Sequence, residues 1–169
     1  MRNDVRYSCD SRPKEGILQQ ISCDLGRPAG GGVVSTDIAS AVRGLRQLYP
    51  NIELWFALKV GPGLLDGSRA IFQRGSDSLD GFVIAKRTLH ERKICTLWVD
   101  PSKRRQGLAS DLMAEASEWL GTRFPLITVG EERLSELGKL FEYHSFVCTG
   151  AIEGIYRRHR KEFIFNGWL

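Results

Sequence analysis

The residues best suited to chemistry lie between Arg104 and Ser110, where the sequence reads RRQGLAS. Gly107 stands just before a segment with helical spacing, and the first amides of a helix have no hydrogen-bond partner within it. The helix dipole adds positive potential there. A glycine lets a ligand approach the backbone without meeting a Cβ, and Arg104 and Arg105 add charge. These features describe an anion site suited to phosphate, although a plain helix start with solvated basic residues has the same pattern.

The elements on either side of this turn must position it. Residues 93–100, KICTLWVD, read as a strand, and HER links them in a tight hairpin to a second strand at 81–89. A helix is predicted to begin near Gln106. Its apolar face consists of Leu108, Leu112, Ala116, Trp119 and Leu120, with Met113 at the edge.

The rest of the chain alternates between strand-like and helical patterns. Helices are predicted at 14–25, at 133–143 and after a cap at Ser35 or Thr36, with the stripe Ile38, Val42, Leu45 and Leu48. Strands are predicted at 5–8, 53–60, 70–73, 125–129, 147–155 and 162–166. The segment GRPAGGG, 26–32, reads as a loop, and RRHRK, 157–161, as a hairpin turn. Hairpin-linked strands mixed with strand–helix–strand units imply an α+β fold with a mixed sheet.

Length and composition limit the possible classes. The chain has 169 residues and a net charge of +4, which fits a single domain over 1–169 and permits an anionic partner. No apolar run is long enough to span a membrane, and the first residues lack the apolar centre of a signal peptide. We therefore expect a cytoplasmic protein with no membrane partner.

Cysteine and histidine usage indicates neither disulfides nor a metal site. The four cysteines, Cys9, Cys23, Cys95 and Cys148, lie far apart. We expect four reduced thiols, with Cys95 buried in its strand. The three histidines have no metal-ligand spacing with each other or with a cysteine, so no metal is expected.

The turn around Gly107 resembles a family signature. R-R-Q-G-L-A is similar to the R/Q-x-x-G-x-G/A motif of the GNAT (GCN5-related) N-acetyltransferase superfamily, with Arg104, Gly107 and Ala109 at its defining positions. The preceding L-x-V-x-P (Leu97, Val99, Pro101) and the following L-M-x-x-A (112–116) also resemble it. Residues 129–146 are similar to the family's later strand, helix and closing Y-x-x-x-G-F segment. The resemblance extends from about residue 53 onward.

The resemblance implies a fold, a cofactor and a reaction. The fold would be a single GNAT-like domain, mostly helical over 1–52, with the cofactor motif at 94–120. Its central sheet would be mixed and mostly antiparallel, flanked by helices, with splayed strands at the cofactor site. The cofactor would be acetyl-CoA (coenzyme A), and the reaction an acetyl transfer by direct attack of an amine. Acceptors in such a family include small molecules, proteins and aminoacyl-tRNA.

The family's contacts can be carried onto this sequence. The pyrophosphate would bind the amides of Arg105, Gln106, Gly107, Leu108 and Ala109, with Arg104 and Ser110 nearby. The pantetheine arm would pair with the backbone of Leu97 and Val99, since an unpaired strand edge satisfies amides. The Val99 amide would stabilise the oxyanion.

The proton donor for the leaving thiolate is where the sequence departs from the family. Aligning FEYHSF with Y-x-x-x-G-F puts Phe141 at the tyrosine position and Ser145 at the glycine position. Phe141 cannot donate a proton. Tyr143 and His144 follow it closely but point elsewhere around a helix. The candidates are these two residues, Tyr156 on the last strand pair, and water or another residue.

Several side chains could serve the acceptor amine. Glu91, Asp100, Glu131 and Glu132 also have simpler roles as solvated, loop-capping or helix-terminal charges. Glu162 faces its neighbours on the final strand and could line an acceptor groove. The side chain of Trp98 points to the opposite face of the strand from those of Leu97 and Val99. It could pack in the core or line the acceptor site.

Other functions remain open. The charge and RRHRK permit toxin-like acetylation of aminoacyl-tRNA, or a non-catalytic acyl-CoA-binding or RNA-binding module. The terminal apolar residues Phe163, Phe165, Trp168 and Leu169 fit either a homodimer edge or a packed terminal strand.

Overall fold

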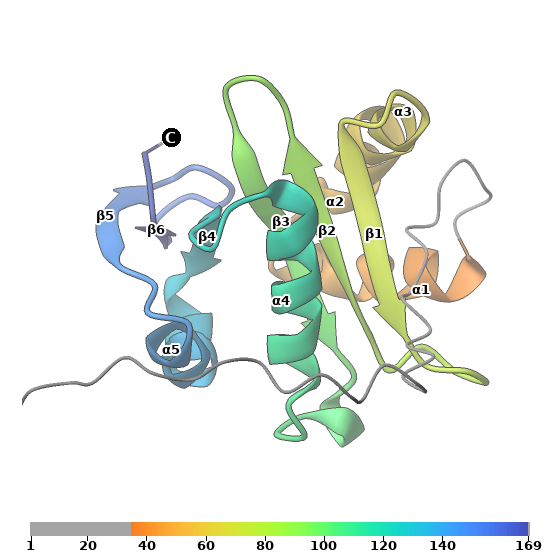
Figure 1. Ribbon diagram of the computed structural model, residues 1–169. Coiled ribbons are helices and arrows are strands. Elements are labelled where there is room, and N and C mark those ends of the chain that lie inside the picture. Colours follow the sequence, from red (N-terminus) through yellow and green to blue (C-terminus); the bar gives the residue numbers. More distant parts are fainter. Residues whose placement is uncertain (1–34, 169) are drawn as a thin grey trace, which may run out of the picture.

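The structure is a computed structural model that describes residues 35–168 of the chain (Figure 1). The helices are α1 (Thr36–Gly44), α2 (Ile52–Trp55), α3 (Gly61–Leu65), α4 (Leu108–Leu120) and α5 (Leu134–Tyr143). Short turns of other helix types are η1 (Leu45–Gln47), η2 (Phe56–Val60), η3 (Pro101–Lys103) and η4 (Glu131–Arg133). The strands are β1 (Arg69–Arg74), β2 (Gly81–Arg87), β3 (Arg92–Val99), β4 (Leu126–Gly130), β5 (Cys148–Glu153) and β6 (Lys161–Phe165).

The six strands form one sheet in the order β1-β2-β3-β4-β6-β5. All neighbours run antiparallel except β3 and β4, which are parallel. Helix α4 supplies the crossover that a parallel pair requires. The prediction of a mixed, mostly antiparallel sheet flanked by helices is confirmed.

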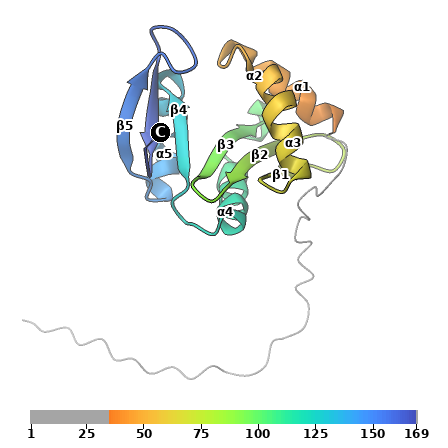
Figure 2. The ribbon, with the colours of Figure 1, turned by 90° about the horizontal axis from the view of Figure 1, so that it is seen from above.

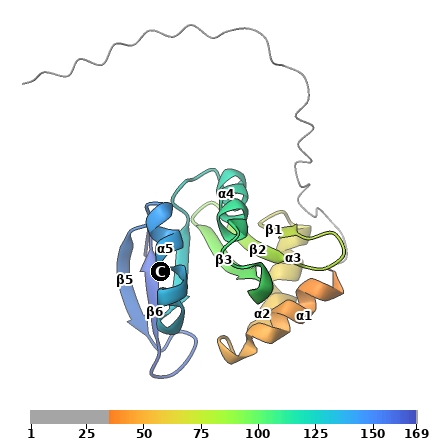
Figure 3. The ribbon, with the colours of Figure 1, turned by 90° about the horizontal axis from the view of Figure 1, so that it is seen from below.

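The sheet is divided between β3 and β4. These strands pair at only two positions, Lys93 with Leu126 and Ile94 with Ile127. Figures 2 and 3 show β1–β3 on one side of the division and β4–β6 on the other. Past Ile94 the two strands separate, which is the splay that the family resemblance implies.

Two apolar clusters hold the layers together. The first lies between the sheet and helices α4 and α5, and it includes buried residues of β1, β2, β3, β4 and β6. The second lies under α1–α3 and contacts β1, β2 and β3 only. The core on the α4 face is therefore continuous across the division, whereas the core on the α1 face stops at β3.

The prediction of a strand at 53–60 is wrong, because this segment is helical from α2 through η2 into α3. A short apolar run does not distinguish a strand from a buried helix by itself. Here Ile52, Trp55, Phe56 and Val60 turn inward with helical spacing, while Leu54 is 60% exposed. Packing of these side chains against β1, β2 and β3 selects the helical spacing.

The other predicted elements within residues 35–168 are present, with ends shifted by a few residues. Ser35 caps α1, accepting a hydrogen bond from the Ile38 amide at 3.3 Å. Cys95 lies in β3 as predicted, but it is half-buried, and it and Cys148 are free thiols. Several predictions lie outside the described residues: the strand at 5–8, the helix at 14–25, the loop at 26–32, and the thiols of Cys9 and Cys23.

The described residues contain no helix with the length and apolar character needed to cross a membrane. Nor do residues 35–168 hold a group of three or more His, Cys, Asp or Glu side chains arranged to bind a metal.

Candidate active site

Helix α4 begins in an open turn with free amides. Gly107 is its N-cap with φ +86°, and no side chain of the cap bonds the first amides. A Cβ added at Gly107 would meet no atom within 4 Å, so the glycine serves the backbone conformation and faces open space. Arg105 also has a positive φ, 62°. Two left-handed residues before an uncapped helix direct backbone N–H groups into one concave turn, which suits an anion.

The edge of β3 beside this turn is unpaired. The Asp100 amide donates to the Asp80 carbonyl at 2.9 Å, so it points toward β2. Backbone groups alternate along a strand, which directs those of Trp98 toward β2 and those of Leu97 and Val99 toward β4. Because β4 pairs with β3 only at Lys93 and Ile94, Leu97 and Val99 present their backbone to the opening between the half-sheets.

Arg104 connects this edge to helix α5. Its Nε donates to the Val99 carbonyl at 3.3 Å, and its Nη1 lies 2.8 Å from Glu136. The guanidinium is thus held between β3 and α5, which fixes the turn, whereas Arg105 and Gln106 are exposed.

The end of α5 contacts the start of α4. His144 is the C-cap of α5, and its Nε2 lies 2.9 Å from Ser110 Oγ in the first turn of α4. Burial lowers the pKa of His144 from its ordinary value. The neutral imidazole is therefore favoured beside the uncapped amides.

Comparison with known proteins identifies this arrangement. Residues 62–132, which include β3, the turn and all of α4, match the sequence model described as the Acetyltransferase (GNAT) family. A GNAT-family protein from Desulfovibrio desulfuricans has the same fold, with a TM-score of 0.61 at 16% identity, covering 79% of this chain and 93% of its own. This chain has the GNAT acetyltransferase fold.

Further GNAT structures agree. An acetyltransferase of the GNAT family from Bacillus cereus gives a TM-score of 0.57 at 20% identity, over 79% of this chain and 92% of its own. Arabidopsis thaliana NAA60 in complex with acetyl-CoA gives a TM-score of 0.57 at 19% identity, and the match covers 82% of this chain and 94% of that chain. No curated protein matches the sequence. The predicted resemblance to the GNAT superfamily is confirmed.

The GNAT tyrosine position is filled by a core residue. Phe141 is 2% exposed and stacks on Phe146, with ring centroids 5.7 Å apart and planes at 9°. It also contacts Phe165, with ring centroids 4.6 Å apart and planes tilted by 50°. Ser145, at the glycine position, has φ 57°. Its amide donates to the Glu142 carbonyl, and the Phe146 amide to the Phe141 carbonyl. This is a Schellman motif, in which the stacked pair is the accompanying apolar contact.

The two predicted donors beyond Phe141 are placed differently. Tyr143 is 78% exposed and touches His144 only edge-on, with ring centroids 5.2 Å apart. His144 reaches Ser110. Of the pair, the structure brings His144 to the GNAT motif and leaves Tyr143 toward solvent.

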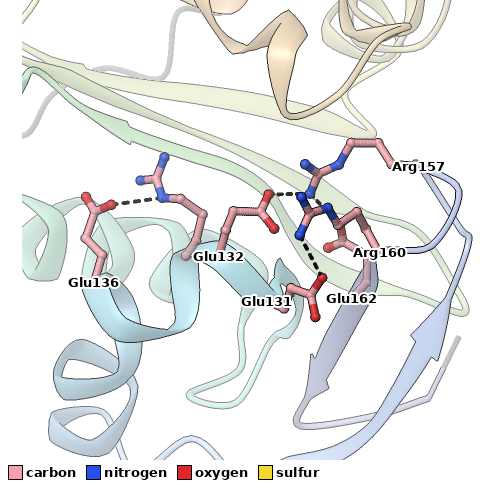
Figure 4. A network of polar contacts seen from close by, with 7 residues as sticks. Glu131, Glu132, Glu136, Arg157, Arg160 and Glu162 are labelled. Carbon is pink, nitrogen blue, oxygen red and sulfur yellow. Dashed lines mark hydrogen bonds and ion pairs between the residues drawn. The ribbon is translucent and has the colours of Figure 1, made fainter.

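The candidate carboxylates divide into paired and unpaired groups. Glu91 pairs with Lys86. Asp100 caps η3, and hydrogen bonds from Ser102 lower its pKa. Figure 4 shows Arg157 and Arg160, from the β5–β6 connection, reaching Glu132 and Glu131 at the start of α5. Glu162 alone among these is buried without a hydrogen bond from any residue of 35–168.

Trp98 has the core-packing role predicted as one of its two alternatives. Its ring packs on Phe82, with centroids 5.8 Å apart. It also lines an open hollow of about 360 Å³ on the α1 face, together with Asp37, Ser40, Ala41, Asp77, Ser78 and Leu79.

The basic run is the predicted turn between β5 and β6, and two of its arginines are engaged by glutamates. Its neighbour Tyr156 meets Tyr49, which follows η1, with ring centroids 5.4 Å apart. This contact joins the half-sheets across the opening on the α1 face. Sequence reasoning missed Tyr49, whose only signal is an aromatic residue at the end of an amphipathic helix.

The terminal apolar residues form part of the domain. Phe165 is buried and Phe163 packs against the main core, so the packed-strand alternative holds for both. Trp168 is exposed, and Leu169 lies outside the described part of the chain.

Proposed function

We propose that this protein is an N-acetyltransferase that transfers an acetyl group from acetyl-CoA to an amine. The observation that carries the proposal is the backbone of Leu97 and the N–H of Val99, which have no partner in β4, beside the uncapped start of α4. Proteins of the same fold are found with acetyl-CoA or coenzyme A bound. This juxtaposition offers one ligand both a strand partner and an anion site.

The phosphate end of the donor would bind the turn. Amides of Arg105, Gln106, Gly107, Leu108 and Ala109 would donate to the pyrophosphate, with Ser110 at its side. The space beside Gly107 accommodates it. Arg104 would act mainly by holding the turn, because its guanidinium already binds Val99 and Glu136.

The thioester end would extend along β3. Amides of the pantetheine arm would pair with Leu97 and Val99 as an added strand, and the Val99 N–H would donate to the carbonyl oxygen as negative charge develops there. A neutral amine would attack the carbonyl carbon, forming the C–N bond as the C–S bond breaks. Tyr143 and His144 are the candidates to protonate the thiolate. The contact of His144 with Ser110 places its ring beside the phosphate end of the donor.

The acceptor class is an amine-bearing molecule. Structures with this fold include a spermidine N-acetyltransferase chimera and an aminoglycoside 6'-N-acetyltransferase, which supports a cationic small molecule. The pairing of Arg157 and Arg160 with glutamates reduces the free positive charge that an RNA acceptor would need.

Calorimetric titration with acetyl-CoA tests the donor site. Ala109 is the second residue of α4, where an acidic side chain favours the helix, so Ala109→Asp should fold while its carboxylate occupies the amides and repels phosphate. We expect a Kd on the order of 1–100 μM for the wild type. Binding should weaken by roughly tenfold or more in Ala109→Asp and much less in the uncharged control Ala109→Asn. Equal binding by all three proteins, or none by the wild type, would refute the proposal.

A further inference from the structure

Glu162 is a carboxylate buried without compensation. It lies in β6 with 1% of its surface exposed, and neither carboxylate oxygen has a hydrogen-bond partner among residues 35–168. The nearest cation, Arg157 Nη2, is 4.0 Å away and is bound to Glu132. Burying a carboxylate without hydrogen bonds is costly. Carboxylates with such surroundings are concentrated at functional sites of proteins.

The sheet register places Glu162 beside the opening. Glu162 pairs with Gly130 at the end of β4. Lys93 pairs with Leu126. If this parallel pairing continued for four more residues along both strands, Leu97 would lie opposite Gly130. Glu162 is therefore one strand away from the gap, at the level of the unpaired Leu97. Gly130 has no side chain, and the Glu132 carboxylate and the Arg157 guanidinium occupy the space beside it.

The carboxylate faces the α1 side of the sheet. Phe163 and Phe165 belong to the core on the α4 face, and residues alternate along a strand, so Glu162 points the other way. Burial and the charge of Glu162 both raise the pKa of Tyr49, which places Tyr49 within electrostatic reach of the carboxylate. Tyr49 and Tyr156 thus stand on the same side, across the opening.

Burial is the largest influence on the protonation of Glu162, and it raises the pKa of Glu162 to about 7. The charges around the carboxylate come from several elements. Glu132 from η4 repels its negative charge, whereas Arg157 from the β5–β6 connection and Lys93 from β3 attract it. The group can therefore exchange a proton near neutrality, as a general base must.

We propose that Glu162 is the residue that accepts the proton of the acceptor ammonium, on the α1 side of the opening where Tyr49 and Tyr156 meet. This inference rests on the proposed function. The ionised carboxylate and the aromatic faces attract a cationic amine, and proton transfer to Glu162 leaves a neutral amine and a carboxylic acid. The amine nitrogen then bonds to the acetyl carbon as the C–S bond breaks. Its second proton goes to the departing sulfur, and Glu162 returns the first to solvent.

A structural ion pair with Arg157 is the competing role. In that case Glu162→Gln would leave Arg157 short of a partner and would lower the stability of the protein. In the proposed role the buried charge of Glu162 lowers the stability of the protein when no acceptor is bound. Glu162→Gln should then match or exceed the wild type in urea unfolding at neutral pH.

Catalysis is tested with acetyl-CoA and three probe amines: spermidine, kanamycin and a lysine-containing peptide, with thiol release as the readout. With the best probe, Glu162→Gln should lower kcat/KM by about 10²–10⁴-fold at neutral pH and remove the acidic limb of its pH profile near pH 7. The control Glu153→Gln removes an exposed charge from the neighbouring strand and should change neither. A Glu162→Gln enzyme that keeps its rate and its acidic limb would overturn the proposal.

Two readouts separate this proposal from the donor site. Calorimetry should show that Glu162→Gln binds acetyl-CoA as tightly as the wild type does. A wild type that does not bind acetyl-CoA would refute the proposed function instead. If none of the probes is acetylated, the carboxyl ¹³C resonance of Glu162, assigned by its absence in Glu162→Gln, decides. A midpoint near pH 7 that shifts when spermidine is added supports the inference, and an ordinary glutamate midpoint without a shift rejects it.

Discussion

Ser110 Oγ and His144 Nε2 lie 2.9 Å apart and connect the first turn of α4 to the C-cap of α5. The contact places a titratable ring next to the anion site while the two helices come from opposite halves of the sheet. A change in the charge of His144 would therefore be felt at the helix start that we assign to the donor.

His144 should titrate below its ordinary value of 6.5, because burial disfavours the charged ring. The unfolded chain then binds the proton more readily, so stability falls as pH falls from about 6.5 through the folded-state pKa. NMR titration of the ring protons measures the midpoint, and urea unfolding across that range measures the slope. His144→Asn should reduce the slope. A midpoint at or above 6.5 would contradict this account.

Ser145→Gly should stabilise the protein by about 1 kcal/mol, because Ser145 closes α5 with a positive φ of 57° and glycine adopts that conformation without a steric cost. Urea unfolding provides the measurement.

The matched control is Asn166→Gly, at a φ of 60°. Asn166 accepts from the Val147 amide at 3.0 Å and donates to the Pro125 carbonyl at 3.1 Å. Its loss should therefore cost about 1–2 kcal/mol despite the similar backbone. Destabilisation by Ser145→Gly would show that the serine side chain contributes more than its backbone strain costs.

Ile52→Ala and Leu54→Ala distinguish the observed helix from the expected strand. The two residues would share a face in a strand, but in α2 Ile52 is 5% exposed and Leu54 60%. Ile52→Ala should cost about 2–3 kcal/mol in urea unfolding, and Leu54→Ala less than about 0.5 kcal/mol. Similar losses at both positions would favour the strand.

Phe141→Tyr should not restore the proton donor of the GNAT family. The ring is enclosed by Phe146 and Phe165, so a hydroxyl there lacks a partner and should cost about 1–3 kcal/mol. The exposed Phe124→Tyr is the control and should be neutral in urea unfolding. A Phe141→Tyr protein with full stability and faster acetyl transfer would show that the hydroxyl reaches the opening.

Local patterns predicted much of this molecule because local forces decide those regions. The apolar runs of β2 and β3, the spacing in α4 and the glycine at its start each follow from backbone and side-chain preferences within a few residues. The prediction for 53–60 was wrong because an apolar run is compatible with two periods, and packing against β1–β3 selects the helical one.

Relationships across the sheet could not be predicted in the same way. Alternation places Glu162 on one face of its strand, but its lack of a partner depends on Arg157 being engaged by Glu132. The contact of Tyr49 with Tyr156 depends on how two half-sheets approach each other. Such contacts are set by tertiary geometry that no short window contains.

The division between β3 and β4 separates the domain into two halves, and α4 packs on the half that contains β1–β3. Apolar packing on the α4 face continues from one half of the sheet to the other, so separating the halves on this face would expose the main core. On the opposite face the two halves of the domain meet through the edge-on contact of Tyr49 with Tyr156 beside the opening. A molecule that enters the opening from that side would have to separate these two rings.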